Sequence, residues 1–166
     1  MRPNTNLEGL TADQIIAILG MSPHPEGGHY VETYRDPNAE ALGLPSSLAD
    51  RGSVTSIYFL LKSGESSHWH RVQGVEVWHH YLGSPLLLRV AQRDEDMPTS
   101  VQLGSDFKRG ERPQGIVPSG AWQAAECLAD DPAGYSLVGC TVSPGFTFDG
   151  FELAEAAWAP GPHNGE

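Results

Sequence analysis

Four of the chain's seven histidines lie in one stretch, residues 64–83. They are His68, His70, His79 and His80, and they surround Glu76. Histidine is the commonest metal ligand among side chains, and its imidazole titrates near neutral pH, so it also serves readily as a general acid or base. We therefore expect the chemistry of this protein, if it has any, in this stretch.

The spacing of these residues predicts which of them meet. Alternate residues of a β-strand point to the same face of the sheet, so His68 and His70 are expected to converge on one point inside a barrel. Glu76 follows a turn at residues 73–74 and lies on the next strand, where it can oppose the two histidines. This set is compatible with a metal site and with acid–base catalysis.

The second strand of the stretch has an equally defined face. Glu76 shares that face with Trp78 and His80, whereas His79 points the other way. A carboxylate with apolar neighbours is costly to bury unless it is paired or bound to a metal. We therefore expect Glu76 to face inward, with His80 as a supporting residue and His79 outside the site.

The elements that must position these residues are mostly β-strands. A short helix is expected over residues 7–20, because Thr11 and Gln14 have the spacing of a capping box and Gly20 is a natural stop. An irregular loop with two prolines and two glycines follows. Strands separated by turn residues are then predicted at 29–35, 54–61, 67–72, 75–82, 85–91, 100–103, 116–118, 122–127 and 136–141.

This pattern predicts one all-β domain over residues 1–166, with a sandwich or barrel at 29–157 and a frayed tail at 160–166. No second helical pattern interrupts the strands, so a βαβ architecture is disfavoured. In the strand at 29–35, Tyr30, Glu32 and Tyr34 share a face. Tyr30 and Glu32 are therefore expected to reach a pocket in the barrel.

The composition excludes some classes of partner. The formal net charge of -11 makes a nucleic-acid partner unfavourable, because phosphate binding needs a basic surface. The charge also disfavours an anionic substrate unless arginines such as Arg35 or Arg71 are focused on the pocket. No apolar run approaches the ~18 residues that span a membrane, and no secretory signal is evident, so we expect a soluble, cytoplasmic protein. Cys127 and Cys140 lack CxxC spacing and are expected to be reduced, buried thiols.

The stretch resembles the first motif of the cupin superfamily, G-x5-H-x-H-x3/4-E-x6-G. Gly64, His70, Glu76 and Gly83 match it, and Val72 occupies the position of the second histidine. The second cupin motif, P-x-G-x2-H, corresponds to Pro118, Gly120 and, in place of the last histidine, Gln123. Two of the family's metal ligands are thus replaced, while His70 and Glu76 remain.

Five runs of the chain resemble, in the same order, one small bacterial and fungal branch of cupins, catalogued as a domain of unknown function. The runs are PHPEGGHYVETYR, TSIYFLLKSGESSHWHRV, EVWHH, PQGIVPSGAWQAAE and LVGCTVSPGFTFDGFELA. The resemblance covers about residues 10–157 and implies a double-stranded β-helix, or jelly roll, with an internal pocket and a homodimeric assembly. The fold resembles that of sugar-nucleotide epimerases. The chain departs from the branch at Val31, where a basic residue is expected, and at His68, where a residue that is not a ligand is expected.

Three functions are compatible with these features. The first is an isomerase or epimerase without metal, in which His70 acts as base, Glu76 fixes its tautomer, and Tyr30 or Tyr81 returns a proton, with His80 in support. The second is a metalloenzyme that holds one divalent transition metal through His70, Glu76 and Gln123, completed by His68 or His80. The third is a binding module that holds a small molecule between Trp78, Trp122 and the histidines.

Overall fold

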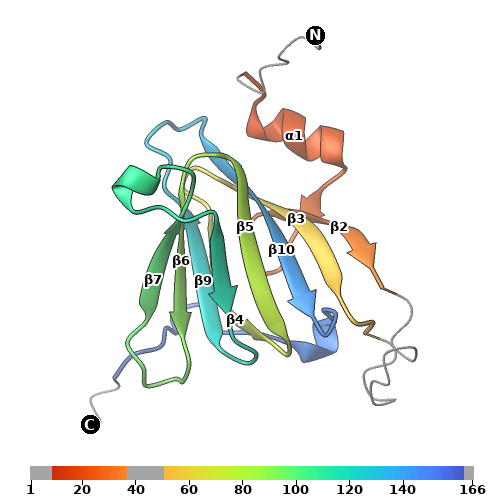
Figure 1. The fold of residues 1–166 in the computed structure, drawn as a ribbon, viewed down its shortest axis with the longest axis vertical. Helices are drawn as coiled ribbons and strands as arrows, with labels where there is room; N and C mark the ends of the chain where they lie inside the picture. Colours follow the sequence, from red (N-terminus) through yellow and green to blue (C-terminus); the bar gives the residue numbers. More distant parts are fainter. Residues whose placement is uncertain (1–8, 37–50, 163–166) are drawn as a thin grey trace.

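The computed structural model describes residues 9–36 and 51–162 (Figure 1). In this part of the chain one helix, α1 (Ala12–Leu19), precedes the strands. The strands are β1 (Ser22–Pro23), β2 (His29–Arg35), β3 (Thr55–Lys62), β4 (Ser66–Val72), β5 (Val75–Gly83), β6 (Leu86–Ala91), β7 (Thr99–Leu103), β8 (Gln114–Val117), β9 (Trp122–Cys127), β10 (Tyr135–Ser143) and β11 (Phe151–Leu153). Two short 3-10 helices, η2 (Phe107–Arg109) and η3 (Phe148–Gly150), lie in the connections before β8 and β11.

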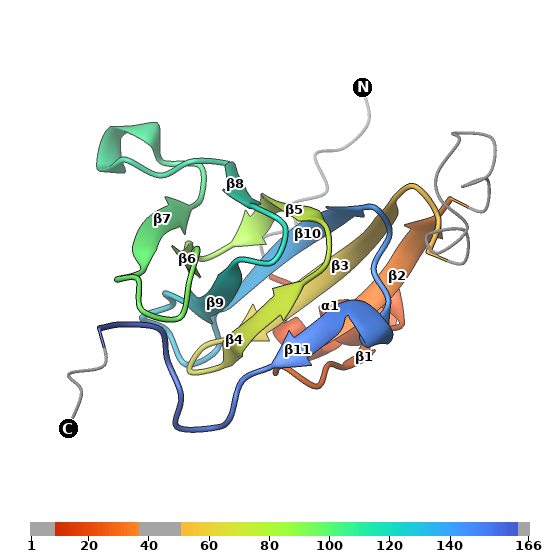
Figure 2. The ribbon, with the colours of Figure 1, turned by 90° about the horizontal axis from the view of Figure 1, so that it is seen from below.

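The strands form two antiparallel sheets that face each other. One has the order β1-β2-β3-β10-β5-β8 and the other β11-β4-β9-β6-β7. Figure 2 looks into the barrel between them and shows β4 and β11 opposite β10, β3 and β2. The all-β jelly roll with an N-terminal helix, expected from the strand pattern and from the cupin resemblance, is confirmed.

The inward faces of the two sheets form the main core. Its largest fully buried side chains come from alternate positions of strands in both sheets, among them Phe59, Leu61, Trp78 and Leu88. Phe59 and Trp78 pack edge to face with their ring centroids 5.7 Å apart. Both rings are buried in the core, and Phe59 also lines the cavity described below.

Helix α1 covers the outer face of the first sheet. Its capping box is formed as predicted, because the Thr11 side chain accepts from the Gln14 N–H and the Gln14 side chain accepts from the Thr11 N–H. Gly20 ends the helix in a left-handed conformation, and Ile15 packs with the outward-facing Leu60. The helix is shorter than the predicted 7–20, of which residues 7 and 8 lie outside the described part. Among the described residues, no helix has the length and apolar character needed to cross a membrane.

The C-terminal segment is attached to the second sheet along its edge. Strand β11 pairs antiparallel with β4, so that Leu153 lies opposite His70. The tail, predicted to fray from residue 160, is held there instead: Pro160 is buried, and the Gly161 N–H donates to the Asp94 carbonyl at 2.8 Å. Residues 163–166 lie outside the described part of the chain.

Strand β4 carries a bulge where it pairs with β9. Ser67 lies opposite Ala125 and His70 opposite Gln123, so residues 68 and 69 together oppose one residue of β9. A bulge of this kind interrupts the alternation of faces along a strand. Residues 68 and 70 therefore do not share a face, although they are two positions apart.

Strand β2 carries a second bulge where it pairs with β3. Glu32 lies opposite Ile57 and Tyr34 opposite Ser56, which leaves Thr33 as an extra residue. Beyond this point the inward positions of β2 shift by one residue. Arg35, which simple alternation would place on the other face from Glu32, is brought to the same side of the sheet as Glu32.

Candidate functional site

A cavity of about 290 Å³ lies between the sheets, at the end of the barrel near β2, β11 and the loop before β2. Of the residues proposed from the sequence, it is lined by Tyr30, Glu32, His70 and Glu76. Its other polar and titratable lining residues are Ser22, His24, Glu26, Arg35, Thr55, Cys140 and Thr147, and its apolar walls include Ile57, Phe59, Phe146 and Phe148.

His70 lies on β4 with 2% of its surface exposed. Its Nδ1 lies 2.7 Å from the backbone carbonyl of His68, and because a carbonyl can only accept, Nδ1 carries the proton. Burial lowers the pKa of His70, so its ring is neutral and Nε2 has a free lone pair. That nitrogen lies 3.2 Å from Oε2 of Glu26.

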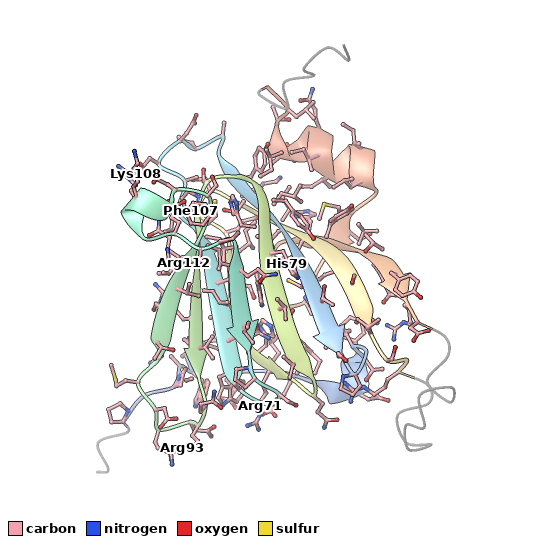
Figure 3. The ribbon with its side chains drawn as sticks, in the orientation of Figure 1. Arg71, His79, Arg93, Phe107, Lys108 and Arg112 are labelled. Atoms are coloured by element: carbon pink, nitrogen blue, oxygen red, sulfur yellow. The ribbon has the colours of Figure 1, made fainter. Side chains whose placement is uncertain are left out.

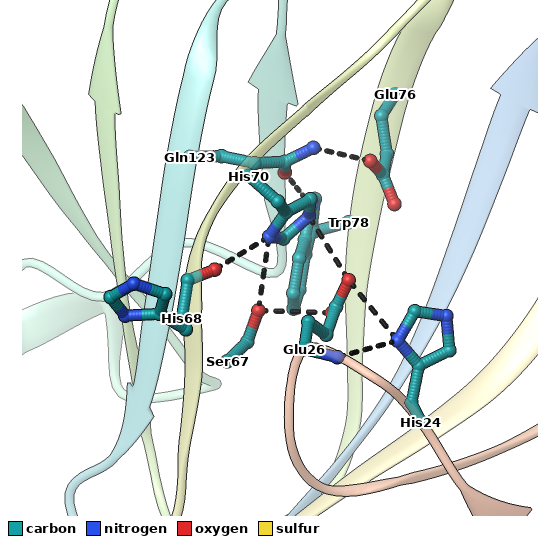
Figure 4. Close-up of polar contacts among 8 residues, drawn as sticks. All are labelled: His24, Glu26, Ser67, His68, His70, Glu76, Trp78 and Gln123. Atoms are coloured by element: carbon teal, nitrogen blue, oxygen red, sulfur yellow. Dashed lines mark hydrogen bonds and ion pairs between the residues drawn. The ribbon is translucent and has the colours of Figure 1, made fainter. Parts of the chain in front are cut away.

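Glu26 is contributed by the loop between β1 and β2. The Ser67 hydroxyl donates to its Oε1 at 2.9 Å, while Oε2 lies between His70 Nε2 and, at 3.3 Å, His24 Nδ1 (Figure 4). Burial raises the pKa of Glu26 to about 8, an effect that the Ser67 hydrogen bond only partly offsets. At neutral pH Glu26 is therefore protonated and can donate to the unprotonated nitrogen of either histidine.

His24 is the third titratable residue of this group and lies against Glu26. Burial, followed by the proximity of His70, lowers the pKa of His24 to about 4. Its Nδ1 accepts from the Glu26 N–H at 3.3 Å. The ring packs edge-on against Tyr30, at 4.6 Å between centroids, and stacks on Phe148 at 6.0 Å. His24, Glu26 and His70 thus form a buried cluster that is uncharged at neutral pH and holds one proton able to move between an oxygen and a nitrogen.

Glu76 on β5 is the second buried carboxyl of the cavity. Its Oε2 accepts from Nε2 of Gln123 at 2.5 Å, and Oε1 of Gln123 accepts from the Trp78 indole N–H at 2.8 Å (Figure 4). Burial raises the pKa of Glu76, against the opposing effects of His70 and of the hydrogen bonds from Gln123 and Cys140. The Trp78–Gln123–Glu76 chain therefore fixes the carboxyl in one orientation.

We tested whether these residues fit the metal that the cupin resemblance implies. Within residues 9–36 and 51–162, no group of three or more His, Cys, Asp or Glu side chains is arranged to hold an ion. Both ends of the Gln123 amide are engaged, one by Glu76 and one by Trp78. The free nitrogen of His70 faces Glu26 at hydrogen-bonding distance. The donor set does not fit a metal centre.

The chain matches a known protein family over most of its length. A family model described as the cupin superfamily (DUF985) matches residues 13–154. The chain belongs to this cupin family. It is 42% identical to protein SO0799 from Shewanella oneidensis, whose X-ray structure gives a TM-score of 0.76 over 88% of this chain and 85% of that one.

Two further relatives have no stated activity. A hypothetical protein from Leishmania major is 37% identical, with a TM-score of 0.75 over 90% of both chains. The uncharacterized yeast protein YML079W, from Saccharomyces cerevisiae, is 27% identical over 145 residues, which cover 82% of this cupin and 71% of the yeast protein.

More distant structures share the fold alone. L-ribose isomerase from Cellulomonas parahominis gives a TM-score of 0.54 at 13% identity, over 71% of this cupin and 61% of the isomerase. The capsular polysaccharide assembling protein CapF from Staphylococcus aureus gives 0.58 at 13% identity, over 82% of this cupin and 34% of CapF. These likenesses support the jelly-roll architecture and do not assign an activity.

In this cupin His68 lies outside the cavity, contrary to the expected His68 and His70 pair. Its Nε2 donates to the backbone carbonyl of Glu155 at 3.0 Å, and the residue serves the site through its backbone, whose carbonyl accepts from His70. The bulge at residues 68–69 is the physical reason, because it breaks the alternation on which the prediction rested.

Four other predicted residues also lie off the cavity. Trp78 is buried in the barrel core and acts through Gln123. Trp78 also separates His80 from Glu76 along β5, and His80 Nε2 donates to the Ser84 carbonyl at 3.0 Å instead. Trp122 points out of the barrel, where Arg71 lies over its ring at 4.6 Å. Gln123 is fully buried and reaches the site only as the partner of Glu76.

The sequence reasoning missed His24 and Glu26, which lie in the irregular loop before β2. A signal for them is present in the two following glycines. Gly27 has φ +113°, and a Cβ on it would lie 2.2 Å from the Ser66 carbonyl oxygen, so the loop passes directly against the backbone of β4. The His68 N–H donates to the Glu26 carbonyl at 2.8 Å and fixes this contact. Only a residue without a side chain at position 27 allows Glu26 to reach His70.

Proposed function

We propose that this cupin is an isomerase or epimerase that moves a proton at a carbon next to a carbonyl group, in a small carbohydrate-like molecule. The observation that carries the proposal is the Glu26–His70 pair, a protonated carboxyl 3.2 Å from an unprotonated imidazole nitrogen, both buried and both lining the cavity. Perturbed titratable groups of this kind gather at catalytic sites because acid–base catalysis needs groups that titrate near neutral pH.

The two carboxyls of the cavity supply the two roles that the reaction needs. Glu76 takes the proton from the carbon, since its raised pKa makes its ionised form a stronger base than an ordinary carboxylate. Glu26 donates its proton to the carbonyl oxygen, and the neighbouring lone pair of His70 lets the proton pass between oxygen and nitrogen. This step gives an enediol intermediate. The isomer forms when Glu76 returns its proton to the former carbonyl carbon and the hydroxyl on the other carbon gives its proton to the Glu26 carboxylate. The epimer forms when solvent protonates the original carbon on its opposite face, the enediol hydroxyl returns its proton to Glu26, and Glu76 releases its proton to solvent.

Tyr30 and His24 line the cavity beside these groups, with their rings packed edge to face. Such rings pack well against the C–H face of a sugar. The cavity volume of about 290 Å³ is at the lower end of the range for ligand sites, roughly 300–1,000 Å³. We therefore favour a single monosaccharide-sized substrate over a sugar nucleotide. L-ribose isomerase from Cellulomonas parahominis, which shares the fold, has X-ray structures with L-ribose and with L-psicose, molecules of this size.

The test is the exchange of substrate C–H protons with deuterated water, followed by NMR across a panel of aldoses, ketoses and sugar acids. We expect at least one compound to exchange and to give an isomer, and Glu26→Gln to slow exchange about 100-fold or more, since it removes the transferable proton. Glu111→Gln is the matched control, because Glu111 is also a buried carboxyl, bound by the Asp106 N–H and Gln102 and remote from the cavity.

Substitutions of His70 should slow exchange as well, and His79→Asn is their control. His79 lies off the cavity, and its ring accepts a hydrogen bond from Gln114. Exchange that disappears with a chelator and returns with a divalent metal would reject this mechanism in favour of the metalloenzyme. A compound that binds in the cavity and is recovered without exchange or isomerisation would reject catalysis in favour of the binding module.

A further inference from the structure

Arg35 is the one arginine or lysine that lines the cavity, in the part of the chain that the structure describes. It reaches the cavity because the bulge at Thr33 turns it to the same side as Glu32. The other arginine considered from the sequence, Arg71, lies over Trp122 outside the barrel. Figure 3 shows further cationic side chains, Lys108 and Arg112, beside the η2 loop and not on β2.

The guanidinium of Arg35 is held in a fixed orientation and still has free donors. Nε and Nη2 donate to the two carboxylate oxygens of Glu32, at 3.1 and 2.7 Å, and Nη1 donates to the Arg51 carbonyl at 2.9 Å. Arginine has five N–H donors. Two of them, one on Nη1 and one on Nη2, therefore have no partner among the described residues.

The charges around Arg35 do not prevent an anion from binding. Glu32 is already paired with Arg35, and the buried carboxyl of Glu26 is protonated at neutral pH. A guanidinium is planar, and two adjacent donors match the two oxygens of a carboxylate. A carboxylate would add one negative charge beside this single cation, which is already paired with Glu32, whereas a phosphate dianion would add two, so the site favours a carboxylate.

We propose that Arg35 binds a carboxylate of the substrate, which makes the substrate a small carbonyl or hydroxyl compound that is also an acid, such as a sugar acid. The inference rests on the proposed function for the reacting end of the molecule. In this arrangement Arg35 anchors the acid group, while Glu26 and Glu76 act on the carbonyl end. Glu32 keeps the guanidinium extended toward the cavity when no substrate is bound.

The test is calorimetric binding of two matched pairs, D-glucuronate against D-glucose and D-galacturonate against D-galactose. We expect at least one acid to bind about tenfold or more tightly than its neutral sugar, the effect of one charge-assisted pair. Arg35→Gln should abolish that preference. Arg89→Gln is the matched control and should preserve the preference, because Arg89 lies away from the cavity. Arg89 and Glu126 form an ion pair whose side chains are 35% and 38% exposed, almost the same as the 33% and 40% of Arg35 and Glu32.

Several results would overturn the proposal. They are the absence of binding by either acid, an equal affinity for acid and neutral sugar, and a preference that survives Arg35→Gln. Tighter, Arg35-dependent binding of glucose 6-phosphate than of glucuronate would also reject the carboxylate, in favour of a phosphate.

Binding and exchange separate this inference from the proposed function. Glu26→Gln should slow deuterium exchange about 100-fold or more and keep the preference for the acid over its neutral sugar, because that preference depends on Arg35, which Glu26 does not contact. Arg35-dependent binding of an acid that never exchanges would reject the isomerase and support the inference. Exchange in a neutral sugar, with a KM unchanged by Arg35→Gln, would support the isomerase and overturn the inference.

Discussion

Strands β2 and β4 border the same cavity, and each carries a bulge with a different outcome. The bulge in β4 turns His68 out of the site and leaves His70 in it, paired with Glu26. The bulge in β2 turns Arg35 into the site, paired with Glu32. Each strand thus places a basic residue beside a glutamate, Glu26 from the loop before β2 in the first pair and Glu32 from β2 itself in the second. The first pair is 2% and 8% exposed and the second 33% and 40%.

This difference in exposure determines the charge of each pair. Charges are costly to remove from water, so the buried Glu26 and His70 are both neutral and share a proton. Arg35 and Glu32 remain in contact with water and form an ion pair. One strand therefore supplies a group for proton transfer, and the other supplies a fixed charge for recognition.

Gly27→Ala should have the largest effect on stability, and it acts on the buried pair, Glu26 and His70. A Cβ there would lie 2.2 Å from the Ser66 carbonyl oxygen and would strain a φ of +113°, so the loop must move away from β4 and withdraw Glu26 from His70. We expect a loss of about 3 kcal/mol or more in the free energy of unfolding, measured with urea.

Gly64→Ala is the matched control for this substitution. Gly64 also has a positive φ, +79°, but no atom lies within 4 Å of its Cβ position. Its replacement should cost only the conformational strain, about 1 kcal/mol. Equal losses for the two variants would show that the contact between the loop and β4 does not position Glu26.

The buried proton of Glu26 should make the free energy of unfolding depend on pH, which is a smaller effect than that of Gly27→Ala. The folded protein keeps a proton on Glu26 up to about pH 8, whereas the unfolded chain releases it near 4.5, so the stabilisation by this group is full below pH 4.5 and is lost as the pH rises through 8. Between pH 6.5 and 8 the free energy of unfolding should fall by up to roughly 1.4 kcal/mol per pH unit. Glu76 acts in the same direction, since its pKa is also raised.

Glu26→Gln should remove most of this slope when unfolding is measured at several pH values in that window. Below pH 6.5 the lowered pKa values of His24 and His70 have the opposite effect, because the unfolded chain then binds the protons that the folded protein does not. A slope between pH 6.5 and 8 that is the same in Glu26→Gln would show that Glu26 is ionised in the folded protein.

The smallest effect should come from the exposed pair. Arg35→Gln removes an ion pair that water screens, so we expect a change in the free energy of unfolding of about 0.5 kcal/mol and no change in its pH dependence. A loss above about 2 kcal/mol would show that Arg35 supports the fold, and its assignment to ligand recognition would then need a separate argument.

Most of the fold could be predicted from the sequence, because alternation and turn residues act locally. The nine predicted strands lie within two residues of their predicted bounds, whereas the short strands β1 and β11 lie outside the predicted set. The inward face of β5 was predicted correctly for Glu76 and Trp78. The two bulges could not be predicted, since one extra residue in a strand leaves no local mark and depends on the partner strand. For this reason His68 was placed in the site and Arg35 was not.

The loop before β2 shows a second limit of the sequence. His24 and Glu26 reach His70 only because their loop crosses β4, about 40 residues further along the chain. No periodicity relates residues that meet in this way. His70 and Glu76, by contrast, were recoverable because the cupin motif holds them at fixed spacing, and the register that pairs His70 with Gln123 supports the same motif.

The rings that η3 and β11 place against the histidines of the cavity affect how the protein can be made in the cell. The rings of Phe148 and Phe151 pack against His24, and Phe151 also packs against His70, at 5.5 Å between centroids. A ribosome that has released β1 to β10 has already supplied His24, Glu26, His70 and Glu76. Both histidines nevertheless lack these ring contacts until residue 151 emerges, so during synthesis this protein should acquire most of its sheets before the histidines of its site are fully packed.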